Sequence, residues 1–403
     1  MNKKLMAVAV AGALAAPAVA FAQASSVQIY GRANLGFDNW SATGATGNTA
    51  AVNNDLKSRN RVYDSGSRLG FRGTEDLGNG LRAIFVLESG VNFDAGTSTT
   101  QGGIANASAG TLASRDSYLG LAGNWGDVRF GRQSIFWVSG PNGQTGANYI
   151  NNEIGWYNGA TFGRVAGPSA RTSNVVSYNS PTWSGFNFSV SYSPQSEAQT
   201  AGLNTDAKIW GVTLRYEGPI GVQYDHGRNE AFSGGANQLR ITGDKLSVGW
   251  PYQPGGRISV ITIRDKNDDT AAVANFSALH DNISQSMWGI NWEHMMGNWQ
   301  FLAMWSKLKN ASGCNALNAT PNVAAGTNGC AGTDATGYTL GVKYFFSKRT
   351  QIYTSWIQHR NSFNQTADIS GGGYSSTTTG VTLPGPSAGA DPRIIAVGVW
   401  HSF

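Results

Sequence analysis

The sequence predicts an all-β protein, a sixteen-stranded antiparallel transmembrane β-barrel with short turns at one end and long loops at the other. Three observations predict this fold. Short segments repeatedly alternate apolar with polar side chains, glycine-rich turns separate them, and the composition combines 53 glycines and 11% aromatic residues with only 13% charged residues. Alternating segments of about ten residues, with aromatic residues toward their ends, are typical of barrels whose outer face meets lipid.

The start of the chain has the composition of a secretory signal peptide. Lys3 and Lys4 precede an alanine-rich apolar run, and the stretch from Ala20 to Ala22 fits the small-x-small cleavage rule. We place cleavage after Ala22, with Ala24 as the second choice. Residues 1–22 are therefore a predicted signal peptide, and residues 23–403 are predicted to form a single barrel domain.

The clearest hairpin in the sequence spans residues 67–88. Apolar residues alternate with arginine and glycine in its first arm, and with Arg82 and Glu88 in its second arm. Between the arms, Asn79 and Gly80 supply the positive-φ residues that a tight turn needs. Alternation with a period of two on both sides of a short turn predicts an antiparallel hairpin.

The same unit recurs along the whole chain, after a first strand at 27–37 and a polar loop that runs to about Arg59. The other predicted strands are 114–122, 127–133, 173–179, 186–192, 208–216, 220–227, 245–250, 257–264, 287–294, 299–307, 338–346, 350–358 and 393–403. Seven short turns alternate with eight longer loops, and an even strand number with this asymmetry is typical of outer-membrane barrels.

Two strands show the predicted lipid-facing side most clearly. In 338–346 aromatic residues at both ends bracket Leu340 and Val342 on one face. In the last strand Ile395, Val397 and Val399 share a face, and Phe403 is the final residue. An apolar terminal strand is an aggregation risk in a soluble protein, whereas in a barrel it closes against the first strand.

Period two also places charges on the polar faces, toward the predicted interior. The inward basic residues are Arg32, Arg68, Arg72, Arg82, Arg129, Arg215, Lys245 and Lys343, and Arg115 joins them in one of its two possible phases. The inward acids are Asp64, Glu88, Asp127 and Asp225. These charges either pair and solvate the interior or form a functional ladder, and the basic excess on the first five strands favours the ladder.

Several segments resemble the trimeric general porins of Gram-negative outer membranes, in the branch typical of β-proteobacteria. The matching segments are 26–31 (SVQIYG), 67–78 (SRLGFRGTEDLG), 81–85 (LRAIF), 126–133 (GDVRFGRQ) and 398–403 (GVWHSF). The resemblance implies a homotrimer of sixteen-stranded barrels in outer-membrane lipid, each with its own water-filled channel. It also implies that the barrel-assembly machinery recognises Phe403.

The family further implies that the third long loop, about 134–170, folds inward and narrows the channel. Its six aromatic residues suit packing on the barrel wall. Such loops often carry several acids that face a basic wall, but here the only charged residues are Glu153 and Arg164. The expected channel-lining set is therefore Arg32, Arg68, Arg72, Arg82, Arg115, Arg129, Glu88, Glu153 and Arg164.

Other chemistry finds little support in the sequence. Gly385-Pro386-Ser387-Ala388-Gly389 matches a nucleophile elbow but lies in a loop before the last strand, and residues 265–269 lack the later ligands of a calcium loop. The five histidines are too widely spaced for a metal motif. We expect no cofactor, metal or enzymatic activity. Without the two signal-peptide lysines the net charge is 27 − 24 = +3, too small to suggest nucleic acid.

The two cysteines, Cys314 and Cys330, lie in one polar loop, and export to an oxidising space favours a disulfide between them. The sequence as a whole predicts passive diffusion of ions and small hydrophilic solutes through an outer-membrane channel with moderate anion preference. A substrate-selective sugar or organic-anion channel on the same barrel is the alternative. An exported β-rich hydrolase is a distant third, because no catalytic constellation occurs at a credible spacing.

Overall fold

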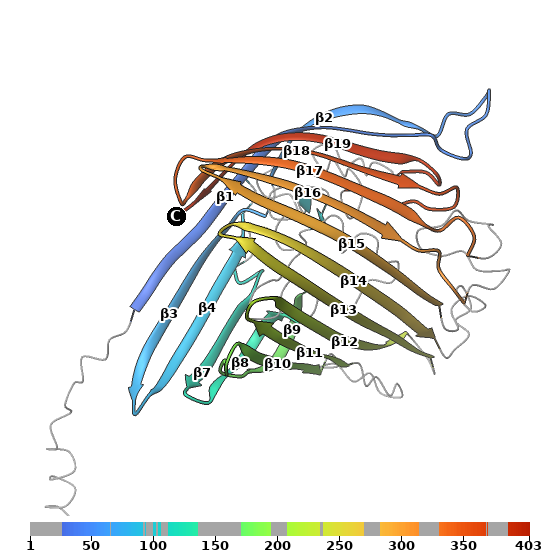
Figure 1. The fold of residues 1–403 in the computed structure, drawn as a ribbon. Coiled ribbons are helices and arrows are strands. Elements are labelled where there is room, and N and C mark those ends of the chain that lie inside the picture. The colour runs from blue at the N-terminus through green and yellow to red at the C-terminus, as the bar shows by residue number, and fades with distance from the viewer. Residues whose placement is uncertain are drawn as a thin grey trace, which may run out of the picture.

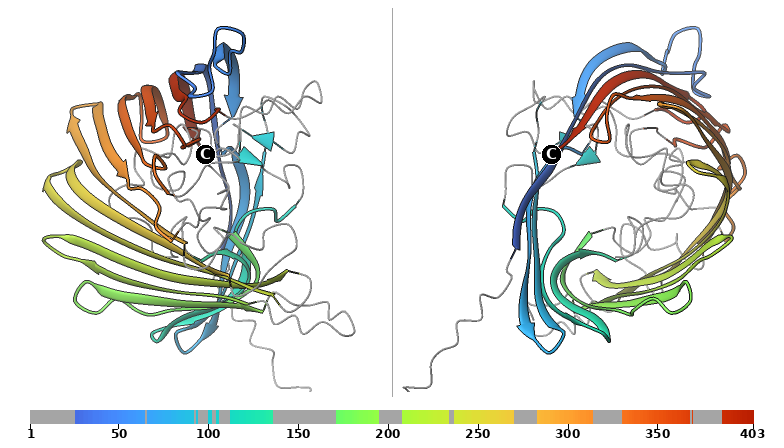
Figure 2. Two further views of the ribbon diagram at one scale, coloured as in Figure 1. Left: turned by 90° about the vertical axis from the view of Figure 1, so that its right-hand side faces the viewer. Right: turned by 60° about the vertical axis from the view of Figure 1, so that its left-hand side comes forward.

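The computed structural model describes residues 26–64, 66–91, 93, 100–101, 104–105, 112–135, 171–194, 208–233, 237–269, 283–313, 330–367, 369 and 386–403. They form one antiparallel sheet that curves into a barrel (Figures 1 and 2). The barrel closes where β1 (Ser26–Thr43) pairs with β19 (Asp391–Ser402), with Gly36 opposite Gly398. The described residues include no helix that is both long and apolar enough to cross a membrane.

The wall strands follow one another in chain order, and each pairs with its neighbours. They are β2 (Leu56–Asp64), β3 (Arg68–Gly78), β4 (Leu81–Gly90), β7 (Ser117–Gly123), β8 (Gly126–Ser134), β9 (Arg171–Asn179), β10 (Phe186–Pro194), β11 (Lys208–Glu217), β12 (Gly221–Ser233), β13 (Asn237–Gln253), β14 (Gly256–Asp269), β15 (Ile283–Met296), β16 (Trp299–Leu308), β17 (Ala335–Phe345) and β18 (Thr350–Asn361). A separate pair, β5 (Thr100–Gln101) and β6 (Ile104–Ala105), lies outside this sheet.

The sheet contains 17 strands, of which β2 and β3 are two parts of one bent strand. The first part of β1 pairs with β3 and its second part pairs with β2. Between them the Asp64 side chain accepts a hydrogen bond from the amide of Ser67 at 2.9 Å, and Gly66 has a positive φ of 73°. Counted as one, they leave sixteen wall strands, so the predicted closed sixteen-stranded antiparallel barrel is confirmed.

Three predicted loops are wrong in their extent. The stretch after the first strand is not a loop to Arg59, because β1 continues to Thr43 and β2 begins at Leu56. Residues 228–233 and 237–244, also left between strands, extend β12 and β13, and residues 265–269 belong to β14 rather than to a loop tip. Polar side chains occupy both faces there, so the hydropathy pattern of a half-buried strand is lost while backbone pairing continues.

The two faces of the wall differ in polarity as predicted. Leu340 on β17 and Ile395, Val397 and Val399 on β19 are between 50% and 55% exposed on the outer face. The inner face is polar and tightly packed, with small hydroxyl residues such as Ser193 buried along it. Apolar outside and polar inside is the arrangement of a barrel that spans lipid around an aqueous interior.

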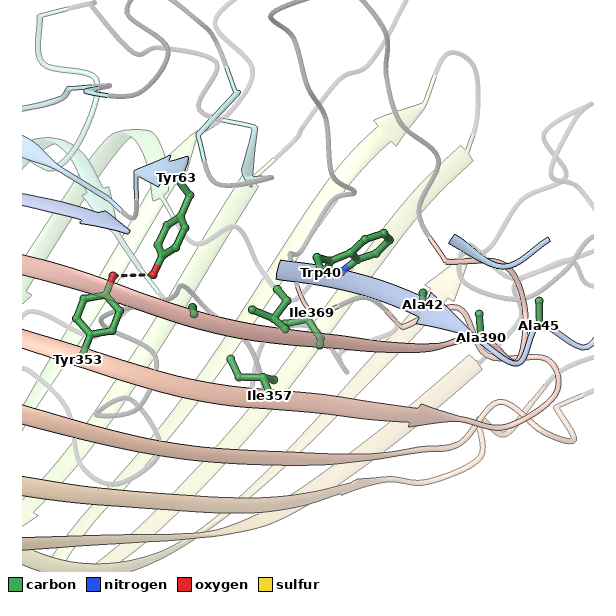
Figure 3. Close-up of a cluster of buried hydrophobic side chains, with 10 residues drawn as sticks. Trp40, Ala42, Ala45, Tyr63, Tyr353, Ile357, Ile369 and Ala390 are labelled. Atoms are coloured by element: carbon green, nitrogen blue, oxygen red, sulfur yellow. Dashed lines mark hydrogen bonds between the residues drawn. The ribbon is translucent and has the colours of Figure 1, made fainter. Parts of the chain in front are cut away.

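A buried row of two tyrosines and two glycines crosses the strand pair that closes the barrel. Register places Tyr63, Gly36, Gly398 and Tyr353 side by side on β2, β1, β19 and β18. The two tyrosine hydroxyls share a hydrogen bond of 2.8 Å (Figure 3). A Cβ added at Gly36 or Gly398 would lie 2.5 Å or less from the neighbouring tyrosine ring, so glycine is what lets both rings lie over the closing strands.

The chain that follows β18 covers part of the inner wall. Ala367 packs with Ile261, Ile263 and Met287, and Ile369 packs with Ile357 near Trp40 (Figure 3). The Gln365 amide donates a hydrogen bond to the carbonyl of Thr333 at 2.5 Å. These contacts account for the apolar residues that point inward on β14 and β15, because the returning chain shields them from the interior.

Candidate channel lining

The inner face of the first strands carries the arginines that the sequence predicts for a channel. Arg32 on β1 stands in register with Arg68 on β3. Glu88 on β4 stands opposite Gly70, the residue midway between Arg68 and Arg72. Because alternate residues of a strand share one face, Arg32, Arg68, Arg72 and Glu88 all point toward the interior.

Glu88 is the centre of a charged cluster on this wall. Its carboxylate lies 2.5 Å from Nε of Arg115 and 3.4 Å from Nε of Arg68, and it accepts a hydrogen bond of 3.1 Å from the Tyr30 hydroxyl. The carboxylate is buried, so these contacts compensate its desolvation. Two guanidinium groups share one carboxylate, which leaves a local excess of one positive charge. Arg115, whose phase the sequence leaves open, reaches this inner cluster.

Three inward arginines lie over aromatic rings. Arg32 lies 4.4 Å from the centroid of Trp400, Arg72 lies 5.1 Å from that of Tyr30, and Arg129 lies 4.7 Å from that of Tyr118. Each ring belongs to an adjacent strand and also points inward. A cation over the face of an aromatic ring is stabilised without a counter-charge, so the positive charge of these groups is not cancelled by the contact.

The remaining predicted residues of the first strands differ in their partners. Arg129 also pairs with Asp127 at 2.6 Å, and the Asn179 amide donates a hydrogen bond to the same carboxylate. Arg82 is exposed on the inner face near the β3–β4 turn. Within the part of the chain that the structure describes, neither Arg82 nor Arg72 has a carboxylate partner.

The far wall is closer to electrical balance. Lys245 on β13 lies 3.0 Å from Asp225 on β12, which also accepts a hydrogen bond of 2.7 Å from Thr213. Arg215 pairs with Glu217 on the same strand. Lys343 on β17 is buried on the inner face, as its phase predicts. The predicted inward basic residues of this wall are therefore mostly matched by acids.

Sequence reasoning missed several inward acids. Asp38, in the part of β1 that was expected to be loop, forms a 2.7 Å ion pair with Arg61 on β2. Asp265 on β14 and Glu293 on β15 are also buried on the inner face. The alternation that places Met287 inward would have identified Glu293, six residues later. The interior is therefore less one-sided than the predicted eight basic residues against four acids.

The last residue docks on the first strand. The amide and carbonyl of Phe403 exchange hydrogen bonds of 3.1 Å with those of Gly31. A Cβ at Gly31 would lie 2.4 Å from the Phe403 ring, so the ring lies directly over this glycine. The terminal aromatic residue therefore completes the pairing that closes the barrel, on the outer face of β1.

The family follows from comparison with known proteins. A family model described as Gram-negative porin matches residues 7–364, which is most of the chain. The chain belongs to the Gram-negative porin family. Its relatives are outer membrane proteins of Gram-negative bacteria, and its apolar outer face fits that membrane, so the barrel of this porin spans the outer membrane.

The curated relatives match part of this porin. Outer membrane porin protein 32 of Delftia acidovorans is 34% identical over 63% of the chain and 67% of its own length. An outer membrane porin protein of Bordetella pertussis is 32% identical over 62% of the chain and 66% of its own length. Major outer membrane protein P.IB of Neisseria gonorrhoeae is 31% identical over 56% of the chain, and the match spans 61% of that relative.

Solved structures agree on the fold. The anion-selective porin from Comamonas acidovorans superposes with a TM-score of 0.67 at 22% identity, covering 94% of this porin and all of that chain. The trimer form of OmpT, an outer membrane protein of Vibrio cholerae, gives a TM-score of 0.60 at 14% identity over 94% of this porin. At these identities the likeness concerns the barrel architecture alone.

Some predicted residues lie outside the described part of this porin. They are Glu153 and Arg164, with nearly all of the third loop, and Cys314. Cys330 is disulfide-bonded, and the sequence contains one other cysteine. The inward third loop and the pairing of Cys314 with Cys330 stay predictions.

Proposed function

We propose that this porin forms a water-filled channel for passive diffusion of ions and small hydrophilic solutes across the outer membrane, with moderate anion preference. Permeation involves no reaction and no cofactor: size exclusion at the narrowest point and the charge of the wall select the solute. The observation that carries the anion preference is the sharing of the Glu88 carboxylate by Arg68 and Arg115, together with Arg72, which lies over the Tyr30 ring without a carboxylate partner among the described residues.

A count of inward charges over the whole barrel gives weaker support for the anion preference. The far wall is nearly balanced, and Asp38, Asp265 and Glu293 add inward acids. On the first strands, however, Glu88 is shared by two arginines, and Arg72 and Arg82 have no carboxylate partner among the described residues. A narrow channel with low-dielectric walls concentrates such a field, so its sign should control ion permeation.

Planar-bilayer recording under a salt gradient tests both parts of this proposal. Insertion of the purified porin should give discrete conductance steps, and the reversal potential should indicate anion preference that weakens as salt screens the wall charges. Absence of conductance steps would refute the diffusion channel. A cation-selective channel at low salt would instead refute the anion preference and leave the channel itself in place.

A substrate-selective channel is the second candidate, because the relatives include sugar channels. The monosaccharide porin of a Halomonas species is 28% identical over 63% of this chain, and the chitoporin of Vibrio furnissii is 29% identical over 47%. Saturable block of the ion current by a single sugar or organic anion would favour this candidate over general diffusion.

We propose a homotrimer as the assembled form, in line with the trimeric form of the Vibrio cholerae neighbour. The seven tight turns then face the periplasm and the longer loops face outward, with the third loop folded into the channel. Phe403 is the residue that the barrel-assembly machinery would recognise. Gel mobility of the unheated protein, compared with the heated protein, tests the trimer.

Processing and the disulfide belong to the same proposal. Cleavage after Ala22 would remove residues 1–22, and N-terminal sequencing of the protein from membranes identifies the site. Cys314 and Cys330 should be bonded to each other and dispensable for transport. Strong thiol labelling of the unreduced, unfolded protein would contradict the bond, and loss of conductance in the double serine variant would contradict dispensability.

A further inference from the structure

One carboxylate joins both ends of the third long loop. Ser134 is the last residue of β8 and Arg171 is the first residue of β9, so the loop leaves and rejoins the wall at these two positions. The Ser134 hydroxyl donates to the Asp116 carboxylate, whose oxygens lie 2.9 and 3.1 Å away, and Arg171 Nε donates to the same group at 3.0 Å. Asp116 directly precedes β7, so the carboxylate belongs to a neighbouring part of the wall and not to the loop.

A second contact braces the same place. Arg132 on β8 donates one hydrogen bond to the carbonyl of Ser114 at 3.1 Å and another to the Ser173 hydroxyl on β9 at 2.8 Å. The register of β8 with β9 shifts between Gly131 and Gln133. A bulge at such a point bends a strand and redirects the chain that joins it. The segment before β7 therefore holds the ends of β8 and β9 where the wall is irregular.

The chain leaves β8 toward the interior of the barrel. Ile135, the residue after β8, is 3% exposed and packs with Val175 and Ile209. A Cβ added at Gly211 on β11 would lie 2.8 Å from the Ile135 side chain, so the glycine leaves room for it. Gly211 shares the inner face of β11 with Thr213. Ile135 thus reaches from β8 toward β11 along the inner wall.

We propose that Asp116 is a positioning residue for the channel constriction: it fixes the base of the third loop and thereby sets the width of the channel. This inference rests on the proposed channel with an inward third loop. The pairing of β7 with β8 ends at Ser117 and Arg132. Beyond that pair, the contacts of Asp116 with Ser134 and Arg171 tie the two loop ends to the chain before β7.

Polymer exclusion in planar-bilayer recordings tests this role with a probe that carries no charge. Polyethylene glycols of increasing mass, present on both sides, change the conductance only while they enter the channel, and the largest that enters is the polymer cut-off. Asp116→Ala should raise this cut-off above that of the wild-type porin. The fraction of time outside the main conductance level should rise about tenfold, because a hydrogen bond to a charged group shifts an equilibrium by roughly that factor.

The matched control is Asp334→Ala. Asp334 directly precedes β17 and lies 2.6 Å from Nζ of Lys307 on β16, so it also joins the two ends of a long loop. Its removal changes the net charge by the same amount and should leave the polymer cut-off as in the wild-type porin. The variant D116A/R171Q removes one charge of each sign, and it should match Asp116→Ala because the effect comes from the position of the loop.

Two results would overturn the proposal: an unchanged cut-off in Asp116→Ala, or an equal increase in Asp116→Ala and Asp334→Ala. Asp116→Asn keeps the side-chain shape and an acceptor for Ser134, so it should raise the cut-off by a smaller amount. This milder variant decides the matter if the alanine variant fails to fold, which gel mobility without heating would reveal. Absence of conductance steps in the wild-type porin would instead refute the channel itself, and with it this inference.

Discussion

Removal of the Tyr353 hydroxyl tests how this barrel is closed. It donates a hydrogen bond of 2.8 Å to Asn34 Oδ1 on β1 and shares one of 2.8 Å with the Tyr63 hydroxyl on β2. Both contacts pass over the pairing of β1 with β19, which joins the two ends of the chain. The substitution Tyr353→Phe removes both while it keeps the ring over Gly398.

The magnitude follows from burial. Tyr63 and Tyr353 are 2% and 3% exposed, and Asn34 is fully buried, so both hydrogen bonds are made away from water. A typical hydrogen bond contributes about 1 kcal/mol to stability. Because two hydrogen bonds are lost, we expect Tyr353→Phe to lower the free energy of unfolding by about 2 kcal/mol. Tyr63→Phe should cost less, because it leaves the bond to Asn34 in place.

Urea unfolding of the detergent-solubilised porin, followed by gel mobility without heating, measures this effect. The control is Tyr192→Phe, because Tyr192 is 45% exposed on the outer face. In a double-mutant cycle, Tyr63→Phe and Tyr353→Phe should show coupling, since one bond joins them. Equal unfolding midpoints for Tyr353→Phe and Tyr192→Phe would show that the tyrosine row does not hold the closing strands.

The other predictions concern selectivity, assembly and the first loop. Arg32→Ser with Arg68→Ser should move the reversal potential toward the cation side with similar or larger conductance, because Arg115 still neutralises Glu88; an equal shift in Arg264→Ser, outside the channel, would contradict this. Deletion of Phe403 should lower the outer-membrane yield while export continues, and normal insertion would refute its role. The Asp55 carboxylate accepts hydrogen bonds from the amides of Ala45 and Gly44, and that from Ala45 contributes most to a pKa below the ordinary 3.8. Because the folded pKa of Asp55 is depressed, its hydrogen bonds stabilise the loop fully above the unfolded pKa, and this stability is lost as pH falls through the folded pKa. Hydrogen-exchange protection of amides 44–55 should therefore persist at about pH 5 and disappear in more acid solution. In Asp55→Ala that protection should already be weak at about pH 5, and early loss in the wild-type porin would contradict the assignment.

Sequence pattern predicts the lipid-spanning part of this fold well, because there each strand has one apolar and one polar face. The face assignments of Leu340, Val397 and Arg68 follow from period two alone. The pattern fails beyond the lipid, where 38–43, 56–64, 228–233 and 237–244 remain strands with polar residues on both faces. Backbone hydrogen bonds continue these strands, and the hydropathy pattern does not indicate such bonds.

The channel lining is predicted in its members but not in its partners. Alternation identifies Arg68 and Glu88 as inward, yet only register across β3, β4 and the chain before β7 brings Arg115 to the same carboxylate. The tyrosine row was missed as well. Isolated glycines in regular strands, Gly36 and Gly398, are the signal that could have identified it, because such glycines mark a close approach of other groups.

The way the inner arginines are held explains how one wall can remain basic in a packed barrel. Arginines placed opposite carboxylates would be fixed in position, but their charges would cancel. Arginines without any contact would keep their charge, but their long side chains would adopt many positions in the lumen. Stacking of Arg72 on Tyr30 avoids both outcomes, because a ring face holds the guanidinium by its quadrupole and carries no net charge, and the hydrogen bond of 3.0 Å that Arg72 Nε donates to Gln28 is also to a neutral group. Tyr30 is thus as much part of the proposed selectivity as Arg72, and replacing its ring by leucine should loosen the arginine without changing the charge of the wall.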